Sequence, residues 1–254
     1  PAKEKGGAKG VKEIFTVAED PKKIPSVGRY FLTEYVSGQR IVYQRNPDYW
    51  EKDENGNSTV YPEKYICQIA SDSNTRYLLF KQGKIEDFSP SPEMLEDIVN
   101  GASNLQEQGY TVFSSGGSMS ASFWTFNQNP KNKGNPYYEW FTKKEFHQAM
   151  SCLLNRERII NQTYRGLGEA KYTFFPQANK FYNEEIILKY RYSHEKARSL
   201  LLQAGFVQDS FGNFFDWNGN PVEFDLTIAS SNPVVSDISQ IITDECKKAG
   251  IKIN

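Results

Sequence analysis

The residues that could carry out catalysis are few and scattered in this sequence. The two histidines, His147 and His194, stand far apart, and we interpret both as surface or hydrogen-bonded side chains rather than metal ligands. Gly166 and Gly168 begin a dinucleotide-binding pattern, but Lys171 occupies the position of its third glycine. No HExxH or GxxxxGK[ST] motif occurs. The sequence therefore predicts that the protein is not an enzyme.

The acidic residues do not form a convincing metal or acid–base site. Asp53, Asn55 and Asn57 match the first ligands of a calcium loop, but Ser58 and Lys64 replace its glycine and its final glutamate. We therefore predict a polar hairpin loop at this position. Adjacent acids are interpreted as solvated charges rather than a glycosidase dyad, since neighbouring side chains of a strand point apart. These pairs are Glu86-Asp87, Glu96-Asp97 and Glu184-Glu185.

The three cysteines, Cys67, Cys152 and Cys246, are widely spaced and each falls in an apolar segment. An odd, sparse count excludes a disulfide scaffold, so buried free thiols are predicted. Neither a metal nor a cofactor is expected.

The composition limits the partners. Lys and Arg total 30 against 31 Asp and Glu, and the net charge of −1 excludes the strongly basic surface that nucleic-acid binding requires. No apolar run is long enough to span a bilayer, and none near Pro1 fits a secretory signal. Any contact with a membrane is expected only through an anchor outside this chain. Aromatic residues make up 14% of the sequence and suit a core or a stacking surface equally well.

Strands and helices are expected to alternate in the first half, after a weakly ordered leader over residues 1–26. Asp72 is expected to cap a helix that extends through Phe80 and has one apolar face. Ser91 is expected to cap a second helix, which ends at Gly101. Strands are predicted over 39–45, 65–70, 85–88, 110–113 and 121–126.

Helices dominate the second half. Residues Thr142 to Glu145 fit a capping box before a helix that reaches Leu154. Three more helices are predicted between a capping side chain and a terminating glycine: Asn155 to Gly166, Ser193 to Gly205 and Asn232 to Gly250. A hairpin turn is expected at Asn218-Gly219.

The end of the chain indicates the fold class. A strand over 222–229, a helix and a strand that begins at Ile251 form a βαβ unit, which is buried within a continuing parallel sheet. The sequence therefore predicts an α/β fold with mixed sheets flanked by helices. We expect the chain to be an internal fragment of a larger fold.

Several short motifs occur in an order that resembles one family. The motifs that carry the resemblance are Val27-Gly28-Arg29-Tyr30, Asn46-Pro47-Asp48-Tyr49-Trp50, Gln82-Gly83-Lys84-Ile85-Glu86-Asp87, Phe126-Asn127, Asn155-Arg156-Glu157, Tyr164-Arg165-Gly166-Leu167-Gly168 and Ala204-Gly205-Phe206. Together they resemble the extracellular solute-binding proteins of ABC importers, of the oligopeptide and dipeptide type (family 5). The family's usual Gly-Pro is replaced by Gly28-Arg29.

The resemblance implies a two-lobed, periplasmic-binding-protein-like fold that closes over a solute. Residues 27–117 would be the later part of lobe I, 118–127 an inter-lobe crossing strand, and 128–254 the first part of a truncated lobe II. The implied function is the solute-binding component of an ABC import system, located outside the cytoplasm. Its implied partners are a peptide or another small solute and the permease subunits.

The resemblance also implies ligand-binding residues. Phe123, Thr125 and Asn127 share one face of the crossing segment, whereas Trp124 and Phe126 have the opposite parity and are expected in the core. Phe174 and Phe175 resemble the loop that lines the second lobe's side of the cleft. Two other functions stay open at this point, a fragment of a carbohydrate-active hydrolase and a protein-interaction module.

Overall fold

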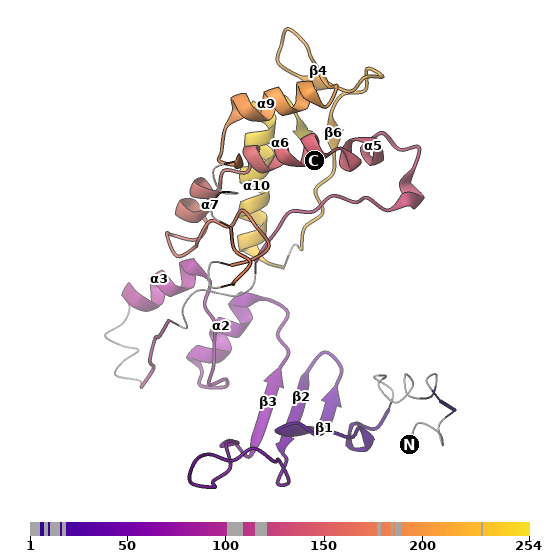
Figure 1. Ribbon diagram of the computed structural model, residues 1–254. Coiled ribbons are helices and arrows are strands. Elements are labelled where there is room, and N and C mark those ends of the chain that lie inside the picture. The colour runs from indigo at the N-terminus through magenta and orange to yellow at the C-terminus, as the bar shows by residue number, and fades with distance from the viewer. Residues whose placement is uncertain are drawn as a thin grey trace. The chain divides into compact units, whose positions relative to one another are not determined.

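The computed structural model describes residues 6–7, 10, 16, 19–100, 109–114, 121–176, 179–183, 185, 189–229 and 231–254. They fall into two compact units, Pro1–Phe88 and Ser89–Asn254, which we describe separately (Figure 1). Most of the predicted leader, Gly101, and residues 118–120 of the predicted crossing strand lie outside the described residues.

The first unit is built on a three-stranded antiparallel sheet in the order β1-β2-β3, next to the short helix η1. An irregularity at Thr33 shifts the register of β1 against β2, and the Thr33 hydroxyl donates to the carbonyl of Val42 across the pair. Among the described residues of this unit, Val60 is the one fully buried apolar side chain. The elements are η1 (Pro21–Lys23), β1 (Tyr30–Val36), β2 (Arg40–Arg45), β3 (Lys64–Gln68) and α2 (Ser73–Lys81).

The helix α2 begins where the sequence predicts it. The carboxylate of Asp72 accepts the amide hydrogen of Thr75, and Gly83 ends the segment with φ at +66°. The expected apolar face is not buried, however, because Leu78 is exposed and Tyr77 and Phe80 are only half-buried. The strand predicted over 85–88 is not formed.

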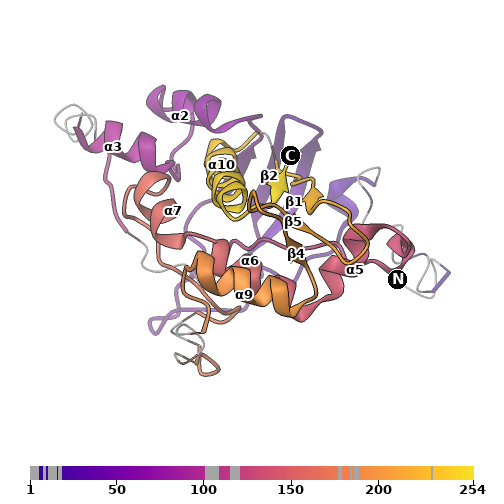
Figure 2. The ribbon, with the colours of Figure 1, turned by 90° about the horizontal axis from the view of Figure 1, so that it is seen from above.

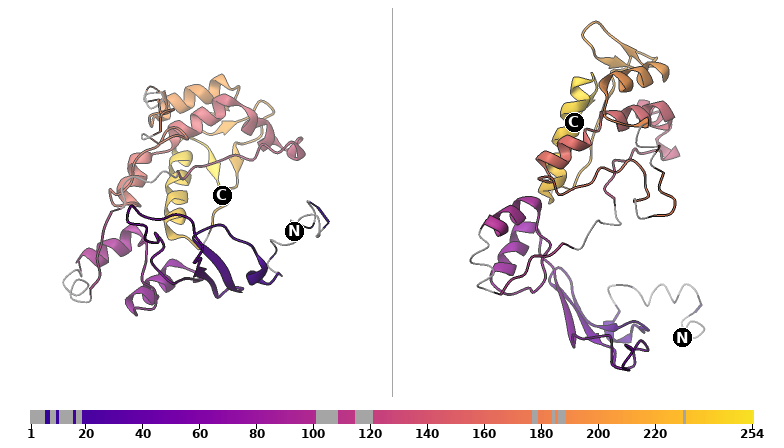
Figure 3. Two further views of the ribbon diagram at one scale, coloured as in Figure 1. Left: turned by 60° about the horizontal axis from the view of Figure 1, so that its bottom comes forward. Right: turned by 60° about the vertical axis from the view of Figure 1, so that its left-hand side comes forward.

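The second unit contains a helical layer and two short pairs of strands. Its elements are α3 (Pro92–Asn100), η2 (Pro130–Asn132), α5 (Pro136–Thr142), α6 (Lys144–Leu153), α7 (Arg156–Gln162), α9 (His194–Gln203), β4 (Val207–Gln208), β5 (Phe214–Phe215), β6 (Glu223–Phe224), α10 (Pro233–Lys248) and β7 (Lys252–Ile253). Figure 2 shows α6 and α9 side by side, and α10 packs against α6 and α7 in this unit (Figure 3).

The core of this unit is rich in aromatic rings. Phe146 of α6 is fully buried and contacts Phe141, Phe206 and Phe224 with ring centroids 5.7, 5.8 and 6.1 Å away. Trp140 donates its indole hydrogen to the buried carboxylate of Asp216. The aromatic content of the sequence therefore serves the core as well as the surface.

The predicted βαβ unit is confirmed. Strands β6 and β7 pair in parallel, Glu223 opposite Lys252 and Phe224 opposite Ile253, and α10 connects them. The first strand is shorter than expected, since only two residues of the 222–229 run pair with β7.

Three other expectations fail in this unit. Thr142 is not a helix cap but the last residue of α5, and its hydroxyl donates to the carbonyl of Glu139. Helix α6 begins directly afterwards at Lys144, without a side-chain cap. No strand is formed over 110–113 or over 121–126, both of which lie in the described part of the chain. The capping side chains of Asn155, Ser193 and Asn232 are confirmed.

Candidate ligand-binding site

The predicted alternation along residues 121–127 is present although the strand is not. Phe123, Thr125 and Asn127 are exposed, whereas Trp124 and Phe126 are half-buried against the core. The ring of Phe126 lies 5.5 Å from Phe146, and that of Trp124 lies 6.4 Å from Phe224. These two contacts anchor the segment to the core, and Phe123, which precedes Trp124, is exposed to solvent.

Phe123 belongs to a row of exposed aromatic rings. Its centroid lies 6.4 Å from that of Phe174, which lies 6.1 Å from Phe175, which in turn lies 5.6 Å from Phe181. The exposed fractions of Phe123, Phe174, Phe175 and Phe181 are 71%, 77%, 40% and 64%. We call these four residues the aromatic row. Contiguous exposed apolar surfaces are found at ligand-binding grooves and at protein interfaces.

The structure thus brings together three of the five predicted site residues, Phe123, Phe174 and Phe175. The other two lie apart from the row. Thr125 is exposed, and Asn127 uses its side-chain oxygen to accept the amide hydrogen of Asn129 at 3.0 Å, which starts the turn into η2. Within the described residues, no ring contact or hydrogen bond joins Thr125 or Asn127 to the row.

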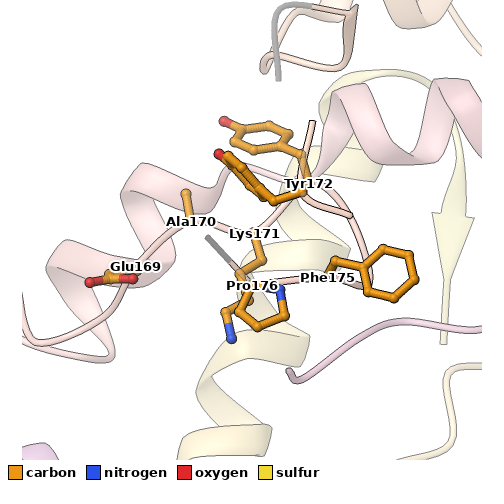
Figure 4. A pocket seen from close by; sticks show the side chains of 7 residues that line it. Glu169, Ala170, Lys171, Tyr172, Phe175 and Pro176 are labelled. Carbon is orange, nitrogen blue, oxygen red and sulfur yellow. The ribbon is translucent and has the colours of Figure 1, made fainter. Parts of the chain in front are cut away.

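A pocket of about 310 Å³ adjoins the row, and Phe175 belongs to both. Figure 4 shows the pocket, with the Tyr172 ring on one side and Phe175 and Pro176 on the other. Its walls combine aromatic rings with one acidic and one basic side chain. They are formed by Glu169, Ala170, Lys171, Tyr172, Phe175, Pro176 and Tyr182. The mixture suits a ligand that carries both apolar and polar groups.

Arg156, the second residue of the Asn155-Arg156-Glu157 motif, fixes one wall of the pocket. Its guanidinium stacks 4.3 Å from the centre of the Tyr172 ring, and Nε donates to the carbonyl of Lys171 at 2.9 Å. The same group donates to the carbonyl and hydroxyl oxygens of Ser151 at 3.0 and 3.1 Å. Burial lowers the pKa of Arg156 from its ordinary value.

Sequence reasoning missed several members of this site. Phe181 and Tyr182 were not predicted, nor was Tyr172. The available signal was the density of aromatic residues over 172–182, where five of eleven positions are Phe or Tyr. The positions that face one pocket could not be chosen from that density, because the segment has no helical or strand period.

The remaining residues that could bind a metal or act as nucleophiles lie outside this pocket. No group of three His, Cys, Asp or Glu side chains among the described residues is placed to hold a metal. His147 lies within hydrogen-bond distance of the Phe141 carbonyl, which agrees with its interpretation as a hydrogen-bonded side chain. Cys152 and Cys246 are buried, whereas Cys67 is half-buried. Burial, with a smaller contribution from Glu245, raises the pKa of Cys246 to about 12, which makes it a poor nucleophile.

The polar loop at Asp53 is confirmed as a turn of the chain. Its carboxylate accepts the amide hydrogens of Asn55 and Asn57, at 2.9 and 2.7 Å. These contacts occupy the Asp53 carboxylate with the loop's own backbone donors.

None of the described helices has the length and apolar content that a bilayer span demands.

The fold of the chain is the one found in bacterial solute-binding proteins. The chain belongs to the bacterial extracellular solute-binding proteins, family 5, whose middle-region model matches residues 8–254. A probable ABC transporter-binding protein of Deinococcus radiodurans is 30% identical over 98% of this chain and 42% of its own length. The oligopeptide-binding protein AppA of Bacillus subtilis is 25% identical over 91% of this chain and 39% of its own length.

Solved structures of the same fold agree with this membership. NikZ from Campylobacter jejuni, solved with Ni(L-His), matches with a TM-score of 0.70 and 19% identity over 89% of this chain and 41% of its own. AppA from Bacillus subtilis, solved with a nonapeptide, matches with a TM-score of 0.68 and 24% identity over 89% of this chain and 41% of its own. The present chain therefore spans about two fifths of the length of these relatives.

Proposed function

We propose that the protein is the solute-binding component of an ABC import system, and that it binds without catalysis. The observation that carries this proposal is the family match over residues 8–254, together with an exposed aromatic row beside a pocket. A binding protein of this kind needs no nucleophile, only two surfaces whose closed state the solute stabilises.

The two surfaces are proposed to be two lobes. Residues 27–117 would contribute to lobe I and residues 128–254 to lobe II, with 118–127 crossing between them. The exposed parity of Phe123, Thr125 and Asn127 supports the assignment of these residues to the solute side of the crossing segment. Phe174 and Phe175 would face the same solute from lobe II, and the 6.4 Å separation of Phe123 and Phe174 supports this arrangement.

A peptide is the solute that we favour, held extended through main-chain hydrogen bonds with its side chains in roomy pockets. The names of the relatives support this choice, since they include oligopeptide-binding and di/tripeptide-binding proteins. Delivery would be to the permease subunits of the transporter, from a location outside the cytoplasm.

The proposal is tested by isothermal titration calorimetry of the full-length protein with a mixture of short peptides and, separately, with sugars and nickel–histidine. We expect saturable heat with the peptide mixture, and the mixture to be recovered chemically unchanged afterwards. Hydrolysis of the peptides, or no binding of any of the three solute classes, would contradict it.

A further inference from the structure

The spacing of the aromatic row carries information about the solute. Successive ring centroids are separated by 6.4, 6.1 and 5.6 Å. In an extended chain each residue advances by about 3.3 Å, so side chains two positions apart on one face lie about 6.6 Å apart. The separations are those of ordinary aromatic pairs, about 4.5–7 Å, and they are also close to the repeat of alternate side chains along an extended peptide.

The chemistry of the row matches apolar side chains. The Phe123 and Phe174 rings are tilted by 53° and the Phe174 and Phe175 rings by 90°, so the surface has faces and edges between which another apolar group can insert. Most of the surface of Phe123 and Phe174 is exposed, and its removal from water on binding would be favourable. A carboxylate placed against these rings would lose hydration without gaining a hydrogen-bond donor from them.

The row is also held in place before any ligand binds. Trp124 and Phe126 anchor the segment that carries Phe123 to the core. The hydroxyl of Thr173 donates to the carbonyl of Phe175 at 2.8 Å and closes the turn that carries Phe174. Such preorganisation reduces the ordering cost of binding and supports selectivity.

From these observations we propose that the solute is an extended peptide with apolar or aromatic side chains at alternate positions, which pack on Phe123, Phe174 and Phe175. This inference rests on the proposed solute-binding function and adds a side-chain preference to it. The adjoining pocket, with its carboxylate from Glu169 and its aromatic walls, would accept a more polar group of the same ligand.

The test compares two peptides of identical composition, Ala-Phe-Ala-Phe-Ala and Ala-Phe-Phe-Ala-Ala, by calorimetry on the full-length protein. The alternating peptide is expected to bind about tenfold more tightly, since a second ring–ring contact of about 1 kcal/mol corresponds to roughly this factor. Phe174→Ala is expected to remove most of the difference. Phe211→Ala is the matched control, because Phe211 is 89% exposed and lies outside the row, and it should leave the difference unchanged.

The outcomes separate the two proposals. Equal affinity for both peptides, at any measurable strength, would overturn the side-chain preference and leave the solute-binding function standing. A preference that survives in Phe174→Ala would also overturn it. Absence of binding by either peptide, with saturable binding of sugars or nickel–histidine in their place, would overturn the preference and the choice of a peptide together.

Discussion

The guanidinium of Arg156 lies 4.3 Å from the centre of the Tyr172 ring and ties the wall of the pocket to helix α6. It reaches the carbonyl of Lys171 on one side and the carbonyl of Ser151 on the other. Because Lys171 and Tyr172 both line the pocket, the shape of the pocket depends on a side chain that does not line it.

Substitution Arg156→Ala should therefore loosen the segment 169–176 more than it destabilises the unit as a whole. The carbonyls of Lys171 and Ser151 lose a charged donor, and one such loss costs about 1–3 kcal/mol. We expect amide hydrogen exchange over 169–176 to accelerate by about tenfold or more. Arg198→Ala, which removes an exposed guanidinium paired with Gln208, should leave exchange there unchanged. Equal protection in both variants would contradict this role.

Glu245 is a buried carboxylate that connects three parts of the second unit. It is 2% exposed and accepts from Arg158 of α7 at 2.7 Å, from the Tyr192 hydroxyl at 2.5 Å and from Lys248 at 3.3 Å, while His194 Nε2 lies 3.1 Å away. Burial alone would raise its pKa, but the hydrogen bonds from Tyr192, Arg158, His194 and Lys248 together outweigh burial and lower the pKa of Glu245 to about 2.

Stability should consequently depend on the charge of Glu245 in acid. A carboxyl whose pKa is lower in the folded state contributes stability above its unfolded pKa, and this contribution is lost as pH falls from about 4.5 towards 2. A shift of this size corresponds to about 3 kcal/mol.

We expect Glu245→Gln to unfold at lower temperature at pH 7 and to show a weaker loss of stability than the wild type between these pH values. Asp244→Asn, at the half-buried neighbour that also pairs with Arg158 and Lys248, should retain most of the wild-type pH dependence. Parallel pH profiles for Glu245→Gln and the wild type would refute the assignment.

Three turns have the pattern D-x-x-G-N, beginning at Asp53, Asp209 and Asp216. The last two, which both lie in the second unit, allow the effect of burial to be measured in one loop geometry. The carboxylates of Asp209 and Asp216 each accept two backbone amides and the side-chain amide of the asparagine four positions later. Asp216 is 3% exposed and also accepts from Trp140, whereas Asp209 is only half-buried.

We expect Asp216→Ala to lower the free energy of unfolding by about 2–4 kcal/mol, because buried donors lose their acceptor. Asp209→Ala should cost about 1 kcal/mol, since water can replace its carboxylate. Urea unfolding followed by tryptophan fluorescence measures both. Costs of equal size would show that burial of Asp216 and its bond to Trp140 add nothing.

Gly250 and Gly219 provide another matched pair. Both have φ at +83°, but a Cβ at Gly250 would lie 1.8 Å from the carbonyl oxygen of Gly212, whereas nothing lies within 4 Å at Gly219. Gly219→Ala should cost the roughly 1–2 kcal/mol of a left-handed conformation, and Gly250→Ala at least about 2 kcal/mol more. Calorimetric melting of the two variants tests this, and an equal loss would mean that the close approach at Gly250 relaxes freely.

The features that the sequence predicted well are local ones. Four capping side chains each accept a backbone amide hydrogen from one of the next three residues, so a few neighbouring positions are enough to predict their role. They are Asp72, Asn155, Ser193 and Asn232. Thr142 shows the limit of this reasoning, because the Asn135-Pro136 cap of the preceding helix α5 competes for the same residues. The strands expected over 85–88 and 121–126 failed for another reason, since a strand needs a distant partner that its own sequence does not specify.

In the candidate site too, the local features could be predicted from the sequence and the contacts between distant segments could not. The alternation of exposed Phe123 with half-buried Trp124 and Phe126 follows from their alternate positions in the sequence, and it agrees with the prediction. The pairing of Phe123 with Phe174 and the stacking of Arg156 on Tyr172 depend on how α6, α7 and the following loop pack together. Such contacts join segments that are distant in sequence, and no motif encodes them.

The most direct test of solute capture is a crystal structure of the full-length protein with the tightest-binding peptide from the calorimetric screen. The proposed function places atoms of the peptide within about 4 Å of both Phe123 and Phe174, in van der Waals contact with their rings. A peptide bound elsewhere on the protein, with both rings left in solvent, would contradict it.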